Sequence, residues 1–250
     1  MRLGCNTVLF ATQDLQGALE RVAWCGFTEV ELAAIPGMCE HIEPEQDNVQ
    51  EIRRQIEEAG LRAVAIEAAM NLSVAENILR FLSVLRFAAS LGVEVVNTGN
   101  GGKSDDIESE RAIYQAIREL APRAQDLGVK IGIKAHVNQA IYNTASALRA
   151  LDAVPVEGWG INYDASHLYR VGEDVVQAVQ QLGQRIVSVH IRDTMGTFDD
   201  TFRNRIAAFV EQVQIGGPLD ASGDDGLAAQ EVIEGAIRSW EHGTIEEIQG

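Results

Sequence analysis

The sequence predicts an α/β protein with the (β/α)8 TIM-barrel fold. β-type runs alternate with amphipathic runs along most of the chain, and this order produces right-handed crossovers and a parallel sheet. Four glycines that follow amphipathic runs, Gly26, Gly60, Gly92 and Gly128, are separated by 34, 32 and 36 residues. Division of the 250 residues over eight units gives about 31 residues per unit, the size that a TIM barrel requires.

Each predicted helix carries one apolar stripe and is followed by a turn signal. In the stretch 15–23, apolar residues recur at i, i+3, i+4, i+7 and i+8 before Gly26, which is typical of a helix with one face toward the core. Gly158 and Gly183 indicate later stops. The other helices are expected over 49–59, 74–91, 113–124, 202–213 and 227–240.

Short β-branched runs lie between the helices and predict the strands of the sheet. A short eighth strand is expected at Thr244–Ile248, so that a single domain spans residues 1–250. The other seven predicted strands are Arg2–Leu9, Phe27–Leu32, Leu61–Ile66, Val93–Val96, Val129–Ile133, Gly160–Tyr163 and Ile186–Ile191.

An open, doubly wound sheet is the alternative fold. It would place a G-x-G-x-x-G motif after the first strand, whereas residues 11–14 read Ala-Thr-Gln-Asp. The glycine cluster at residues 99–102 follows the fourth strand and has a different spacing. It is interpreted as a flexible loop, with a phosphate-binding nest as the alternative.

Composition excludes several classes of function. With 20 Lys+Arg against 37 Asp+Glu, the chain carries a net charge of −17, which disfavours nucleic acid and anionic membranes as partners. Three cysteines without a C-x-x-C pair suggest neither a disulfide framework nor a thiolate zinc site. Because no apolar run is long enough for a signal peptide or a membrane helix, a cytoplasmic protein is expected, with homo-oligomerisation left open.

Polar residues mark the ends of otherwise apolar strands, where a TIM barrel carries its chemistry. Taken singly, Asp164 could cap the next turn and His190 could be a buried core histidine. Because an unpaired buried charge is costly, convergence from several strands favours a functional site. The residues are Glu31, Glu67, Asn97 and the i, i+2 pairs Lys134/His136, Asn162/Asp164 and His190/Arg192.

Two of these strand ends resemble a known family. Residues 162–167, Asn-Tyr-Asp-Ala-Ser-His, followed by Gly-Glu-Asp at 172–174, resemble the strand-six signature of the xylose-isomerase-like TIM barrels. Residues 189–193, Val-His-Ile-Arg-Asp, resemble its strand-seven motif, and the similarity covers roughly residues 1–195. The family includes sugar and sugar-phosphate isomerases and epimerases, dehydratases and endonuclease-IV-type enzymes.

The resemblance implies a divalent metal, Mn, Mg, Co or Zn, held by a glutamate ending strand five, by Asp164 and His190, and by a glutamate ending strand eight. Glu246 is the best candidate for that last glutamate, and Lys134 and Glu246 are the predicted catalytic residues. A sugar or polyol is the expected substrate. The predicted substrate-binding residues are Glu31, Glu67, Asn97, His136, His167 and Arg192.

Lys134 departs from the family pattern, because it stands where the family has the strand-five glutamate. A protonated lysine has no lone pair for a metal. Three explanations are open. The ammonium could replace the metal; a neutral amine could act as a base or a Schiff-base nucleophile; or carbamylation could restore a carboxylate.

Three functions follow from these observations. The first is a sugar or sugar-phosphate isomerase or epimerase that moves a proton next to a carbonyl, with assistance from a divalent metal. The second is a dehydratase or other lyase on the same barrel. The third is a metal-free, non-catalytic sugar binder, which Lys134 favours. An endonuclease is disfavoured, because the charge of −17 would repel DNA and because the extra histidine ligands that the resemblance implies for such enzymes have no match at Glu67 or Asn97.

Overall fold

The computed structural model describes residues 3–192 of the 250. These residues lie in one compact unit. The predicted helices over 202–213 and 227–240, the predicted eighth strand and Glu246 lie outside the described residues, and a single domain over 1–250 stays a prediction. None of the helices in the described part of the chain is long and apolar enough to cross a membrane.

Seven parallel strands form the sheet, in the order β1-β2-β4-β5-β6-β7-β8, and β3 pairs antiparallel with β2. Their sequence order equals their spatial order, as successive right-handed βαβ units require. The strands are β1 Cys5–Asn6, β2 Glu29–Ile35, β3 Cys39–Glu40, β4 Arg62–Glu67, β5 Val95–Thr98, β6 Lys130–Lys134, β7 Trp159–Asp164 and β8 Ile186–His190.

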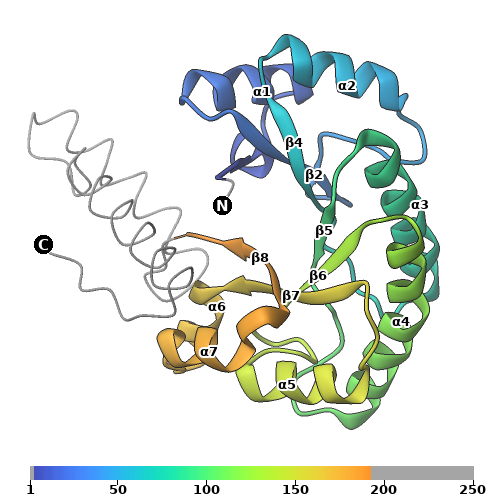
Figure 1. The fold of residues 1–250 in the computed structure, drawn as a ribbon, viewed down its shortest axis with the longest axis vertical. Coiled ribbons are helices and arrows are strands. Elements are labelled where there is room, and N and C mark those ends of the chain that lie inside the picture. The colour runs from blue at the N-terminus through green and yellow to red at the C-terminus, as the bar shows by residue number, and fades with distance from the viewer. Residues whose placement is uncertain (1–2, 193–250) are drawn as a thin grey trace, which may run out of the picture. The chain divides into compact units, whose positions relative to one another are not determined.

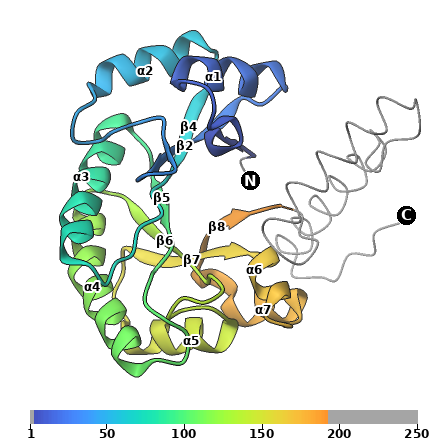
Figure 2. The same cartoon turned by 180° about the vertical axis from the view of Figure 1, so that it is seen from behind.

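Helices follow most of the strands and lie along the outer side of the curled sheet (Figures 1 and 2). They are α1 Leu15–Trp24, α2 Val49–Glu58, α3 Ala75–Leu91, α4 Ile107–Asp126, α5 Thr144–Ala153, α6 Ala165–Arg170 and α7 Val175–Leu182, with the 3-10 turns η1 Thr7–Phe10 and η2 Gly183–Arg185.

Capping residues set the helix ends. The carboxylate of Asp14 accepts a hydrogen bond from the Gly17 amide at 2.8 Å at the start of α1, as an N-cap does. Gly92 ends α3 with φ at 86°, a left-handed conformation that favours glycine. The predicted stop at Gly158 lies beyond the end of α5, which finishes at Ala153, and Gly158 instead turns the chain into β7 with φ at 89°.

The first strand is much shorter than the predicted Arg2–Leu9. It ends at Asn6, whose side-chain oxygen accepts a hydrogen bond from the Val8 amide at 2.8 Å. This bond caps the 3-10 turn η1, because asparagine offers the backbone an alternative to the strand ladder. The β-branched pattern of the sequence predicted a strand where a local cap starts a turn.

The hydrophobic core lies between the sheet and the helices. β2 and β7 are buried along their entire length, as strands covered on both faces must be. In β6, Ile131 and Ile133 are buried in the core cluster. A Cβ added at Gly132, between them, would meet Asn97 of β5 and Asn162 of β7. Gly132 and Lys134 therefore share the inner side of the sheet, which positions Lys134 for the site.

Candidate active site

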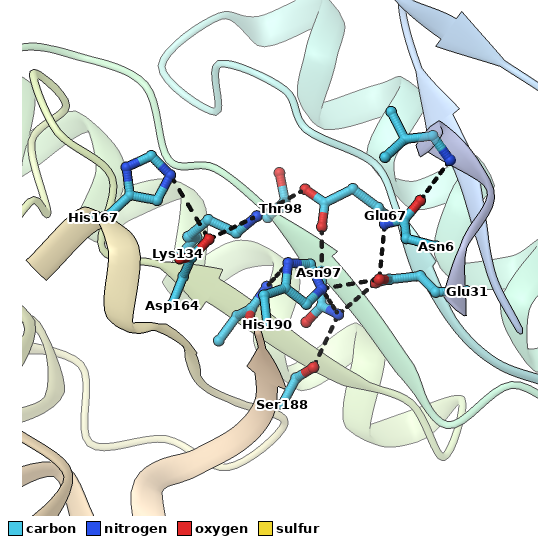
Figure 3. Close-up of polar contacts among 12 residues, drawn as sticks. Asn6, Glu31, Glu67, Asn97, Thr98, Lys134, Asp164, His167, Ser188 and His190 are labelled. Atoms are coloured by element: carbon cyan, nitrogen blue, oxygen red, sulfur yellow. Dashed lines mark hydrogen bonds and ion pairs between the residues drawn. The ribbon is translucent and has the colours of Figure 1, made fainter. Parts of the chain in front are cut away.

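The nine predicted site residues that lie in the described part of the chain come together on the inner side of the sheet. Glu67, Lys134, Asp164 and His190 are the last residues of β4, β6, β7 and β8, and Asn97 is the last residue but one of β5. Glu31 lies in the first half of β2, because this strand continues to Ile35 and does not end at Leu32 as predicted. His136, His167 and Arg192 follow β6, β7 and β8 by two or three residues. The carboxylates, Lys134 and His190 point toward one another (Figure 3). The tenth predicted residue, Glu246, is outside the described residues.

Strand register places the site residues side by side. Glu67 lies opposite Asn97 in the β4–β5 pairing, Lys134 opposite Asn162 in β6–β7, and Asp164 opposite His190 in β7–β8. Because paired residues of neighbouring strands point to the same side, each register pair adds two side chains to one layer. The register of neighbouring strands therefore brings these side chains together.

The deepest part of the site is a hydrogen-bonded group around Glu31. Asn97 donates from Nδ2 to Oε1 of Glu31 at 2.7 Å and to Oγ of Ser188 at 3.0 Å. His190 lies with Nε2 at 2.9 Å from Oε2 of Glu31, which also accepts from Nδ2 of Asn6 at 2.8 Å. Because β2 and β8 are not neighbours in the sheet, these bonds cross its inner side and hold it curled.

The Glu31–His190 contact sets the pKa of both groups in opposite directions. Burial alone would raise the pKa of Glu31, but the charge and hydrogen bond of His190, with Asn97 and Lys134, lower it below the ordinary 4.5. Burial opposes protonation of His190, yet Glu31 and Glu67 raise its pKa above the ordinary 6.5. An anionic Glu31 therefore favours the charged form of His190.

Lys134 lies between two carboxylates from different strands. Its Nζ is 3.6 Å from Oε1 of Glu67 and 3.9 Å from Oδ2 of Asp164. Its side chain is 13% exposed, against 6% for Glu67 and 1% for Asp164. Lys134 is thus the least buried of these three side chains.

Asp164 has partners on both carboxylate oxygens. Oδ1 accepts from the Ser166 hydroxyl at 2.6 Å and from the Ser166 amide at 3.1 Å, and Oδ2 accepts from Nε of Arg192 at 3.2 Å. Burial acts to raise the pKa of Asp164, but Arg192, Lys134 and Ser166 together lower it. Asp164 is therefore held as a carboxylate, and it also caps α6, as the alternative interpretation of the sequence proposed.

His167 and His136 stack with ring centroids 3.9 Å apart. Nε2 of His167 lies 2.6 Å from a terminal nitrogen of Arg192. Since a guanidinium only donates, Nε2 accepts and the hydrogen of the neutral ring is on Nδ1. That atom is buried and has no hydrogen-bond partner in the described part of the chain. Burial, with His136 beside it, lowers the pKa of His167 to about 3.

Two of the four amides in the glycine cluster at residues 99–102 are bound by a side chain of the protein. The amides of Asn100 and Gly101 donate to Oε1 of Gln139, at 2.8 and 3.0 Å. The side chain of Asn100 donates to the carbonyl oxygens of Lys134 and Ile141, each at 2.9 Å. The loop after β5 therefore fixes the backbone of Lys134.

Sequence reasoning missed two residues of the site, Asn6 and Ser188. Asn6 was placed in the middle of a long strand, and the shorter β1 puts it at the strand end, in register with Glu31. Ser188 precedes His190 by two residues and shares its side of β8. The i, i+2 rule that paired Asn162 with Asp164 would have found Ser188, had it been extended inward from His190.

Comparison with known proteins identifies the family. The family described as xylose isomerase-like TIM barrel matches residues 19–216. The chain belongs to this family. The strand-end motifs and the parallel curled sheet agree with it, so the predicted resemblance and the α/β TIM-barrel class are confirmed. A search of curated proteins found no match to the sequence.

Solved structures with the same fold include a dehydratase, an epimerase and a metal complex. The probable 3-DHS dehydratase AsbF from Bacillus anthracis is 21% identical, with a TM-score of 0.67 over 83% of this chain and 80% of that one. D-allulose 3-epimerase from Methylomonas sp., in complex with D-allulose, is 18% identical, with a TM-score of 0.65 over 87% and 82%. A xylose isomerase-like protein from Mycobacterium smegmatis in complex with magnesium is 17% identical, with a TM-score of 0.65 over 77% and 74%.

Among the described residues, Glu31, Glu67 and His190 form a group that could hold a metal ion. One ligand atom of each lies within 4.8 Å of the others, a spacing suited to a metal ion. However, Glu31 only accepts hydrogen bonds, so Nε2 of His190 carries a hydrogen in this arrangement and offers no lone pair.

The residues do not fit the ligand set that the family resemblance implies. Lys134 stands at the position of the strand-five glutamate, and both oxygens of Asp164 have donors. The predicted metal ligands Asp164 and His190 are thus each engaged by other side chains.

Proposed function

We propose that this chain is a sugar or polyol isomerase or epimerase that moves a proton at a carbon next to a carbonyl. The observation that carries the proposal is the placement of Lys134 beside Glu67, with Nζ 3.6 Å from Oε1, at the carboxyl ends of β6 and β4. A cation and a carboxylate at this distance are the two groups that enolisation needs, one for the oxygen and one for the proton. Family membership supports this class of reaction.

The proposed reaction begins at the carbon–hydrogen bond next to the carbonyl. Glu67 takes the proton, and the electron pair of that bond forms a carbon–carbon double bond. The carbonyl oxygen gains the negative charge and accepts a hydrogen bond from Lys134. Of the two carboxylate oxygens of Glu67, Oε2 is buried 3.6 Å from Nε2 of His190 and Oε1 lies 3.6 Å from Nζ of Lys134. We propose that Oε1, on the side of Lys134, takes the proton.

Return of the proton decides between the two outcomes. Delivery to the opposite face of the same carbon inverts that centre and gives an epimer, whereas delivery to the neighbouring carbon gives an isomer. The predicted role of Glu246 is that of the second acid. Glu246 lies outside the described part of the chain, and this role stays a prediction.

The remaining site residues differ in how far they are exposed to solvent. Asn97 and Glu31 are 0% and 7% exposed, and we propose that they hold His190 and the curl of the sheet. Lys134 and Arg192, with side chains 13% and 32% exposed, are proposed to contact the substrate. A hydroxyl-rich ligand suits such donors, because each offers several N–H groups.

The test is solvent exchange with product identification. The protein is incubated with a panel of ketoses, aldoses and polyol ketones in deuterated water, and the products are analysed by NMR and mass spectrometry. Deuterium next to the carbonyl in a product isomeric with the substrate is expected. Glu67→Gln is expected to lower the rate by roughly 10²–10⁴-fold, whereas Glu57→Gln, an exposed change on α2, leaves it unchanged.

Other results would contradict the proposal in specific ways. A product lighter by one water would show a dehydratase. Saturable sugar binding with no deuterium incorporation would show a binding protein. A Glu67→Gln variant with the exchange rate of the parent protein would remove Glu67 as the proton acceptor.

A further inference from the structure

We propose that the ammonium of Lys134 takes the place of a divalent metal in this site, so that the protein binds and works without a metal ion. This refines the proposed function, on which it rests for the role of the ammonium toward a carbonyl oxygen.

The first argument is position. Lys134 ends β6, and its Nζ contacts carboxylates that arrive from both sides, Glu67 from β4 at 3.6 Å and Asp164 from β7 at 3.9 Å (Figure 3). A cation coordinated from several strand ends is the arrangement that a bound metal would have. Here the cation is part of the chain.

The second argument is charge. Glu31, Glu67 and Asp164 supply three negative charges to the site, and Lys134 with Arg192 balances two of them. The remaining carboxylate, Glu31, receives an N–H from His190 at 2.9 Å. A divalent ion would therefore enter a site whose negative charge is already nearly compensated, next to a fixed ammonium that repels it.

The side chains that would bind a metal already have hydrogen-bond partners. Asp164 accepts from Ser166 through one oxygen and from Arg192 through the other. His190 uses Nε2 to donate to Glu31. A metal would have to replace the hydrogen that Nε2 of His190 directs at Glu31 before this imidazole nitrogen offered a lone pair, whereas the ammonium uses the carboxylates as they stand.

The ammonium of Lys134 also has N–H donors that can bind an oxygen of the substrate. A lysine ammonium has three N–H donors. Its 3.6 and 3.9 Å contacts are ion pairs that are longer than hydrogen bonds. Nζ of Lys134 makes no hydrogen bond to another described residue, so its donors are available to an oxygen of the substrate. Like a metal, the ammonium can stabilise the negative charge that develops on a carbonyl oxygen.

The experiment measures metal binding, which does not require a known substrate. The full-length protein is saturated with Mn²⁺, desalted and analysed for metal content, and free Mn²⁺ is titrated by electron paramagnetic resonance. No stoichiometric Mn²⁺ is expected in the parent protein. Lys134→Glu is expected to bind one Mn²⁺ at least about tenfold more tightly, because it removes the cation and adds a ligand. Lys130→Glu makes the same charge change at the exposed start of β6 and is expected to match the parent protein.

Two results would overturn the inference. One is a full equivalent of tightly bound Mn²⁺ in the parent protein, in particular if Glu31→Gln or Glu67→Gln abolishes it, since that would assign a metal to Glu31, Glu67 and His190. The other is an unchanged Mn²⁺ affinity in Lys134→Glu when that variant melts cooperatively. If it does not fold, Lys134→Gln replaces it, with a smaller gain in affinity expected and an unchanged affinity again contradicting the inference.

Failure of this inference is distinguishable from failure of the proposed function. If the parent protein binds a metal and still exchanges deuterium, the isomerase proposal is supported and the role of Lys134 in the metal's place is contradicted. If the parent protein binds no metal and exchanges deuterium on no substrate, the role of Lys134 is supported and the proposed activity is contradicted. With both properties present, turnover is expected to resist a metal chelator.

Discussion

Nε2 of His190, at the end of β8, donates a hydrogen bond to Oε2 of Glu31, on β2, at 2.9 Å. The two strands are not neighbours in the sheet, so this bond spans its inner side. It joins a buried carboxylate with a lowered pKa to a histidine with a raised pKa. Each of the two groups can therefore stay charged although it is buried, because the opposite charge lies beside it.

The first prediction concerns this pair and pH. Glu31→Gln is expected to bring the pKa of His190 down, because burial then acts against the charged ring with only Glu67 to favour it and Lys134 opposing it. The measurement is an NMR titration of the histidine ring protons, with His190→Gln to assign the signal. A titration midpoint that is unchanged by Glu31→Gln would contradict the pairing.

The same variant gives a stability profile whose sign follows from linkage. The lowered pKa of Glu31 adds stability above its ordinary 4.5, which is lost as pH falls through the folded value. The raised pKa of His190 adds stability below its ordinary 6.5, which is lost as pH rises through the folded value. The loss of unfolding free energy in Glu31→Gln, about 3 kcal/mol for a broken buried pair, is therefore expected to be largest between about pH 5 and 6.5. Urea unfolding at several pH values measures it.

The second prediction concerns Asn100, which is fully buried and holds the loop after β6. Its amide donates to the carbonyl oxygens of Lys134 and Ile141 and accepts from the Ile141 amide at 2.9 Å. Asn100→Ala removes all three hydrogen bonds and leaves the Ile141 carbonyl oxygen with the His136 amide as a donor, and it is expected to cost about 3 kcal/mol. Asn77→Ala, which loses a single exposed hydrogen bond, is the control, and equal losses in the two variants would contradict the role given to Asn100.

The third prediction concerns the space above Gly132. A Cβ at this position would lie 2.2 Å from Oδ1 of Asn97, which is fully buried and bound to Glu31. Gly132→Ala is expected to displace Asn97, to lower stability by about 1–3 kcal/mol and to shift the titration of His190. Ile131→Val, a conservative change at the neighbouring position, is expected to leave that titration unchanged. A normal His190 titration in Gly132→Ala would show that Asn97 moves without consequence.

The sequence could predict the sheet and most of the site because both depend on periodicity. Alternation placed Lys134, Asp164 and His190 on one side of their strands, and the structure brings these residues together. It could not predict the ion pairs. Distances such as 3.6 Å from Lys134 to Glu67 depend on how strands distant in sequence curl toward each other.

The misplaced end of the first strand has a similar cause. A strand pattern and a capped turn compete for the same residues, and the outcome depends on one side-chain hydrogen bond of Asn6. Because that boundary was wrong, a partner of Glu31 was missed. Local chemistry that overrides periodicity is the part of this site that a pattern alone does not reveal.

The fourth prediction concerns the protonation state of His167. With a pKa of about 3, the ring is expected to stay neutral down to about pH 4 and to carry its hydrogen on Nδ1, since Nε2 accepts from Arg192. Nitrogen-15 NMR distinguishes the two ring nitrogens, and a hydrogen on Nε2 would contradict the contact with Arg192.

The unfolded chain takes up a proton on His167 at the ordinary pKa of 6.5 while the folded chain does not, so this residue makes stability fall as pH falls below 6.5. His136, Asp164 and Lys134 also face the ring and contribute to its pKa. His167→Gln removes the titrating group and is expected to flatten the pH dependence of unfolding between about pH 6.5 and 4. An unchanged slope in that variant would show that His167 is already protonated in the folded protein.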